Sequence, residues 1–139
     1  MDLRKKFGGD RAMEVDGVDL HLGGDAYITI ARAGGTNVAY ARAVQKYLRP
    51  IRKRDRFESE DLDLEEYADV QRQAFADTIV LGWRGIELDG APLPFTRDNA
   101  LRLMRDLPDL WEVVKAHAEK LANFQREDVE EMGKASPAT

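Results

Sequence analysis

The stretch that decides the fold spans residues 83–95 and reads Trp-Arg-Gly-Ile-Glu-Leu-Asp-Gly-Ala-Pro-Leu-Pro-Phe. Its two glycines and two prolines exclude a helix. Ile86 and Leu88 alternate with polar residues before Asp89-Gly90, which predicts an extended segment, a tight turn and a return to Phe95. The stretch is also rich in large apolar side chains. It therefore predicts a turn that closes over the core, a groove for a partner, or both at once.

The chain before this stretch changes its hydrophobic period once, from that of strands to that of helices. Residues 61–82 place their apolar side chains on one stripe, which predicts a long helix. Residues 36–49 predict a second helix, which Pro50 stops. Residues 13–32 alternate apolar and polar side chains around glycine-rich turns. This alternation predicts an antiparallel β-meander of three strands, the first of them at Met13–Val15.

The chain after the stretch is helical in its pattern. Thr96 can cap a helix, and Pro108 divides the helical run over residues 96–124 into two parts. Apolar residues become sparse after Phe124, so residues 125–139 are expected to form a flexible acidic tail.

The predicted fold class is α+β, with a small N-terminal meander followed by a mainly helical region that contains the hairpin-like turn at 83–95. We expect one domain over residues 1–124. A chain of 139 residues with 43% apolar residues can bury a core without disulfides or metals. It contains no cysteine, which excludes thiolate zinc sites and agrees with a reducing compartment.

Charge is divided unevenly along the chain. Residues 1–56 carry a net charge of +5 and residues 57–139 carry −10. This division suits self-association or contact with a charged partner, but it is better explained by a solvated basic loop followed by an acidic helix N-terminus. The basic run Arg49–Arg56 makes Arg52 and Arg54 candidate contact residues. Nucleic acid is the less favoured partner, because the chain is acidic overall and acids follow this run directly.

No catalytic, metal or cofactor site is predicted. His21 and His117 lie 96 positions apart, and Ser59 and Ser136 are in no nucleophile motif. The paired carboxylates lie in highly charged stretches, where nothing would raise one pKa for acid–base work. No run of about 20 apolar residues and no secretory signal is present. The protein is thus expected to be non-enzymatic, to need no cofactor and to remain in the cytoplasm.

An ordered set of short motifs resembles the tail assembly chaperones of long-tailed bacteriophages. The motifs are Thr78-Ile79-Val80-Leu81-Gly82-Trp83, Asp89-Gly90, Pro92-Leu93-Pro94-Phe95-Thr96, Asn99-Ala100, Leu107-Pro108-Asp109-Leu110 and Asn123-Phe124. The resemblance covers about residues 64–124, and the upstream strands, helix and basic loop are similar with less specificity. Arg84-Gly85-Ile86-Glu87 departs from the family pattern, because it makes the corner short and basic.

The resemblance implies a protein of the host bacterial cytoplasm that binds the tape measure protein, helps to bring tail tube subunits to it, and is absent from the finished virion. Self-association is a further expectation. The alternatives are a structural tail or neck component of the virion, or a nucleic-acid-binding regulator acting through Arg49–Arg56. The candidate partner-binding residues are Trp83, Ile86, Leu93, Phe95, Trp111, Arg52 and Arg54.

Overall fold

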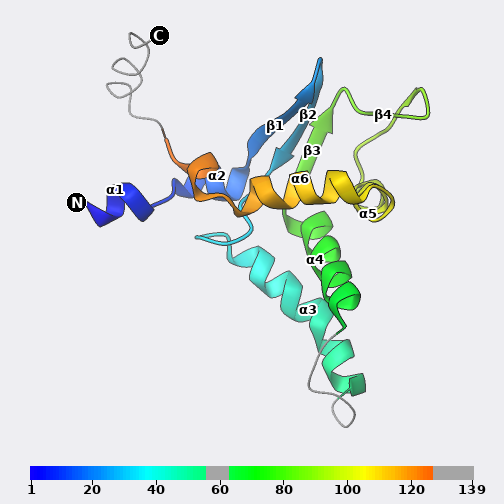
Figure 1. Cartoon of the computed structure of the whole chain (residues 1–139), viewed down its shortest axis with the longest axis horizontal. Helices are drawn as coiled ribbons and strands as arrows, with labels where there is room; N and C mark the ends of the chain where they lie inside the picture. Colours follow the sequence, from blue (N-terminus) through cyan, green and yellow to red (C-terminus); the bar gives the residue numbers. More distant parts are fainter. Residues whose placement is uncertain (56–62, 127–139) are drawn as a thin grey trace.

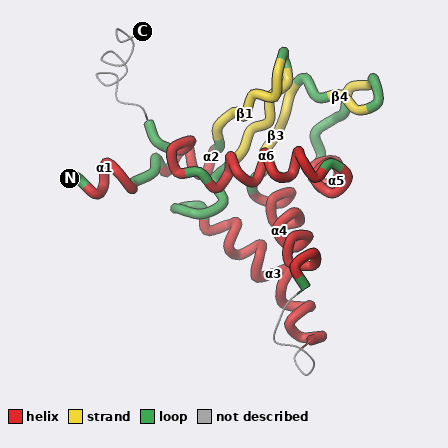
Figure 2. Tube along the Cα trace, viewed as in Figure 1, coloured by secondary structure: helices red, strands yellow, loops and turns green. Residues whose placement is uncertain are grey.

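A small antiparallel sheet and a larger set of helices make up the part of the chain that this computed structural model describes, residues 1–55 and 63–126. The α+β class is confirmed. The elements, in chain order, are α1 (Leu3–Phe7), α2 (Arg11–Asp16), β1 (Val18–Gly23), β2 (Ala26–Ile30), α3 (Val38–Asp55), α4 (Leu64–Thr78), β3 (Val80–Arg84), β4 (Glu87–Leu88), β5 (Ala91–Pro92), α5 (Arg97–Asp106), α6 (Pro108–Glu119) and the 3-10 helix η1 (Leu121–Phe124). In Figures 1 and 2 the pair α3–α4 extends away from the sheet, and α6 crosses between the sheet and this helix pair.

The sheet has the strand order β1-β2-β3, and both neighbouring pairs are antiparallel. β1 and β2 are joined by the predicted turn around Gly24. The third strand is β3, in which Trp83 pairs with Ile28 and Gly82 pairs with Thr29. The three-stranded meander expected over residues 13–32 is therefore wrong in one strand. The third strand of the sheet is β3, which follows α3 and α4 in the chain.

The expected first strand, Met13–Val15, is part of helix α2. The Asp10 carboxylate accepts a hydrogen bond from the backbone N–H of Met13 at 3.0 Å and caps this helix. Gly17, with φ of 86°, ends it. Three alternating residues fit one helical turn as well as a short strand, so the cap decides between the two.

Helix α2 is held in place by a buried carboxylate. Glu14 is 1% exposed, and its carboxylate accepts hydrogen bonds from Arg32 Nη1 at 2.5 Å and from the Thr36 hydroxyl at 3.0 Å. Gly35 lies so close that a Cβ atom there would be 1.8 Å from a Glu14 carboxylate oxygen. The position therefore requires glycine, and the ion pair fixes α2 against the loop that follows β2.

Helix α3 extends beyond the predicted range of 36–49 and runs to Asp55 with Pro50 inside it. Proline removes one backbone hydrogen bond, but tertiary packing can outweigh that loss. Ile51, after the proline, packs against the cluster that joins α3 to α4. The buried members of this cluster are Ala43, Val44, Leu48, Val70 and Ala74.

Helix α4 is shorter than the predicted 61–82. The Asp63 carboxylate accepts hydrogen bonds from two backbone N–H groups of the first turn, and the helix ends at Thr78. Residues 61 and 62 lie outside the described part of the chain. Val80 to Arg84 form strand β3, because the β-branched and aromatic residues of this segment complete the sheet beside β2.

The hairpin-like turn over 83–95 is confirmed, with β4 and β5 pairing across Asp89-Gly90. The Thr96 cap is also confirmed, since its hydroxyl accepts a hydrogen bond from the Asn99 N–H at 3.0 Å. Pro108 starts α6, as predicted.

The first two residues of the expected tail pack against the N-terminus. The Gln125 side chain donates hydrogen bonds to two backbone carbonyls there, and Arg126 pairs with Asp10. The remainder of the expected tail, residues 127–139, lies outside the described part.

Candidate partner-binding cleft

Trp83 anchors the segment that leaves the sheet. Its indole N–H donates a hydrogen bond to the backbone carbonyl of Leu93 at 2.8 Å. Its ring meets the Phe95 ring edge to face, with 4.9 Å between the ring centres. The same side chain packs against the main core beside the buried Ile28. One residue thus ties the outgoing strand, the core and the returning segment together.

Gly85 turns the chain sharply against the sheet. It has φ of 70°, and a Cβ atom there would lie 2.2 Å from the backbone oxygen of Asp25 in the β1–β2 turn. Only glycine combines this left-handed backbone with so close an approach. The Leu93 N–H then donates to the Ile86 carbonyl at 2.9 Å, which fixes the returning segment.

A cleft of about 670 Å³ lies between the β1–β2 turn and the 83–95 segment. This volume is in the range of ordinary ligand and peptide pockets. One wall is formed by the turn and the other by apolar side chains of the 83–95 segment. The lining residues are Gly23, Asp25, Ala26, Trp83, Arg84, Gly85, Ile86, Glu87, Pro92, Leu93, Pro94 and Phe95. The cleft is therefore lined by large apolar side chains together with three charged ones, Asp25, Arg84 and Glu87.

The cleft borders a polar row on the outer face of the sheet. The His21 and Tyr27 rings stack at 4.5 Å, and the Arg84 guanidinium lies 4.1 Å from the centre of the Tyr27 ring. Arg84 also pairs with Asp19 at 3.1 Å. Hydrogen bonds from Thr29 and Arg84 hold the pKa of Asp19 below its ordinary value, the Thr29 bond contributing most. This row was missed in the sequence, although the outward positions of the two alternating strands could have indicated it.

Four of the seven predicted contact residues meet at this cleft, namely Trp83, Ile86, Leu93 and Phe95. Trp111 does not, because it is 5% exposed and packs edge to face against the buried Phe75 at 4.8 Å. Trp111 lies on the buried face of α6 with Val114 and Ala118, so it is a core residue and is not available for a surface contact.

Arg52 and Arg54 lie near the outer end of α3, which Figure 1 places far from β4. Both are exposed, and Arg54 pairs with Glu66 at 2.8 Å. These two arginines therefore belong to a different surface from the cleft. Arg56 of the same basic run lies outside the described residues.

The described ranges 1–55 and 63–126 contain no group of three or more His, Asp or Glu side chains arranged to hold a metal ion. His117 is partly buried, its pKa is lowered by that burial, and its Nδ1 lies 3.3 Å from the Asn123 amide. Within the same ranges, no helix combines the length and apolar character needed to cross a bilayer.

The sequence from residue 35 to residue 135 matches the family model described as YdaY prophage protein. This match includes α3, the 83–95 segment and both helices that follow it. The chain belongs to the YdaY prophage protein family. No curated protein and no solved structure matches it.

Proposed function

We propose that this prophage protein is a non-enzymatic tail assembly chaperone that binds the tape measure protein in the host cytoplasm and helps to bring tail tube subunits to it. The observation that carries the proposal is the cleft at residues 83–95, where partly exposed apolar side chains surround an open volume of about 670 Å³. The motifs of this segment are also those through which the sequence resembles tail assembly chaperones.

A chaperone of this kind needs a surface for apolar segments rather than catalytic groups. Removing apolar area from water contributes about 25 cal/mol per Å², so a cleft with several large side chains can hold an apolar segment of a partner. Asp25, Arg84 and Glu87 also line the cleft, and charged side chains of this kind favour solubility of the free protein. This combination supports reversible binding during assembly.

Leu93 is the position at which a substitution tests the cleft most selectively. It lines the cleft and is partly exposed, yet its side chain is not among those packed against the main core. Its backbone carbonyl, which accepts the Trp83 hydrogen bond, is unaffected by a change of side chain. Leu93→Asp should therefore alter the cleft and leave the anchor intact.

The experiment is co-expression with the tape measure protein of the same prophage, followed by measurement of soluble tape measure protein and of co-purification. The wild-type chain should keep its partner soluble, and Leu93→Asp should lower the yield of complex at least tenfold. Leu107→Asp is the matched control, because Leu107 is 44% exposed and lies between α5 and α6, away from the cleft lining. Equal loss in both variants, or no loss in either, would contradict the assignment of the cleft.

Mass spectrometry of purified virions separates the proposal from the structural alternative. A chaperone should be absent from the finished particle although it is abundant in the induced lysate. Its presence at the copy number of a ring or tube component would instead establish a tail or neck protein.

A further inference from the structure

Helix α3 carries a basic stripe on the face turned away from α4. The stripe consists of Arg42, Lys46, Arg49 and Lys53, all exposed and spaced four, three and four residues apart. This spacing keeps the four side chains within about 60° around the helix axis. The residues that contact α4, such as Val44 and Leu48, lie on the opposite side.

Arginines outside the stripe bind the acids of α4, although Lys46 of the stripe lies near enough to Asp77 for its charge to help lower the pKa of that carboxyl. Glu65 pairs with Arg72, and Glu66 pairs with Arg54 at the end of α3. Arginines of α4 and α5 bind the remaining two acids of α4. Asp69 pairs with Arg72 and Arg105, and Asp77 pairs with Arg97.

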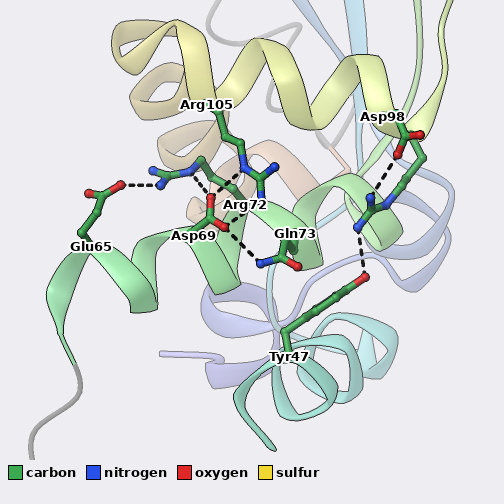
Figure 3. Close-up of polar contacts among 8 residues, drawn as sticks. Tyr47, Glu65, Asp69, Arg72, Gln73, Asp98 and Arg105 are labelled. Carbon is green, nitrogen blue, oxygen red and sulfur yellow. Dashed lines mark hydrogen bonds and ion pairs between the residues drawn. The ribbon is translucent and has the colours of Figure 1, made fainter. Parts of the chain in front are cut away.

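Figure 3 shows part of this network, with Arg72 and Arg105 converging on Asp69. The pKa of Asp69 lies below its ordinary value, chiefly because of the hydrogen bonds from Arg105. By contrast, no ion pair joins Arg42, Arg49 or Lys53 to any residue within 1–55 or 63–126. The stripe therefore keeps its positive charge although the chain is acidic overall.

We propose that the basic stripe of α3 binds the phosphodiester backbone of a nucleic acid. Along the helix axis, Arg42 to Lys53 spans about 16 Å, which is long enough to meet several successive phosphates. Guanidinium groups bind phosphate oxygens through two parallel hydrogen bonds, which suits Arg42 and Arg49 to this role. The proposed contacts are to phosphate oxygens, which carry no sequence information, so the binding should be independent of base sequence.

An acidic protein segment is the competing occupant, and the surroundings of the stripe disfavour it. Protein interfaces are centred on aromatic and large apolar side chains, whereas phosphate contacts need only charge and hydrogen-bond donors. Tyr47 and Ile51 of α3 face the cluster shared with α4 rather than the stripe. The exposed large apolar residue of α3 is Val38, one turn before the stripe begins.

The test is fluorescence anisotropy of the full chain with a labelled DNA duplex of about 20 base pairs, the corresponding single strand and an RNA hairpin, each over about 50–200 mM salt. The wild-type chain should bind with a slope of log affinity against log salt of about −3 to −4 for duplex. The variant Arg42→Ala, Arg49→Ala, Lys53→Ala should bind at least tenfold more weakly at the lowest salt, with a slope near about −1. The tighter of the DNA and RNA arms identifies the source of the phosphates.

The matched control is Arg11→Ala, Arg102→Ala, Lys120→Ala, which removes the same charges from exposed positions outside α3. It should bind as the wild type does. Three outcomes would overturn the proposal: no binding at the lowest salt, equal losses in the two triple variants, or equal competition by polyglutamate of the same charge. None of these variants touches the 83–95 cleft, so the result is independent of the chaperone assay.

Discussion

Trp83 serves the core and the cleft through different parts of one side chain. Its ring packs against the core and against Phe95, while its N–H holds the Leu93 carbonyl. Sequence reasoning identified the residue as important because of its surroundings in a glycine- and proline-rich turn. It left open whether the ring closes the core or faces a partner, and the structure shows the first and permits the second.

Two substitutions separate these contributions. Trp83→Ala should lower the free energy of unfolding by about 3 kcal/mol, because it removes a large packed ring as well as a hydrogen bond. Trp83→Phe should cost about 1 kcal/mol, since it keeps most of the packing and loses the N–H donor. Urea denaturation measures both values. A cost below about 1 kcal/mol for the alanine variant would show that the ring contributes little to the core.

The sequence predicts helix starts and turns correctly where each depends on a strong local signal. The capping threonine at 96, the break at Pro108 and the Asp89-Gly90 turn were all read correctly, because each depends on neighbours within a few residues. Strand β3 was missed for the opposite reason. Its partner β2 lies about 50 positions earlier, and Ile79 and Gly82 continue the helical stripe of residues 61–82 in the sequence.

The prediction that α3 ends near Pro50 was wrong, because it considered only the local effect of proline on a helix. A proline within a helix costs roughly 3 kcal/mol in an isolated segment, yet α3 continues past Pro50. The packing of Ile51 on the far side of the proline favours this continuation. Nothing in the spacing of α3 alone reveals α4 as the partner that stabilises it.

Pro50→Ala is expected to stabilise the protein by about 1 kcal/mol. It restores one backbone hydrogen bond in α3, and the stiffness that proline gives to the unfolded chain offsets part of this gain. Thermal denaturation should show a rise in Tm. Ala39→Gly, at an exposed position near the start of the same helix, should lower Tm through its lower helix propensity. A fall in Tm for Pro50→Ala would show that the helix geometry at residue 50 depends on proline.

Arginine and carboxylate side chains from separate helices connect α3, α4 and α5 into one unit. Arg97 of α5 donates to Asp77 of α4 at 2.7 Å and to the Tyr47 hydroxyl of α3 at 3.0 Å. Arg105 of α5 donates two hydrogen bonds to Asp69 of α4. The partners are 20 to 50 positions apart in the chain, so charge counts along the sequence could reveal the acidic and basic halves but not these pairs.

This network predicts how stability depends on acid. Arg105 hydrogen bonds hold the pKa of Asp69 below its ordinary value of 3.8. Burial would raise the pKa of Asp77, but hydrogen bonds from Tyr47 and Arg97 outweigh it and the pKa is lowered as well. Because the folded-state pKa values lie below the unfolded ones, the unfolded chain binds more protons near these values. The resulting stability is present above about pH 4 and is lost as pH falls through the folded-state pKa values.

Arg105→Gln should therefore destabilise the protein at pH 7 by about 1 kcal/mol, and this difference from wild type should shrink toward zero as Asp69 becomes protonated in both proteins. Urea denaturation between about pH 2 and pH 7 measures the difference directly. Arg102→Gln is the control on the same helix, because Arg102 is exposed and approaches only Asp106, at 4.0 Å, among the described ion pairs. It should leave the acid dependence unchanged. A difference for Arg105→Gln that stays constant down to the lowest pH would mean that Arg105 stabilises α5 by packing, and that its charge on Asp69 adds nothing.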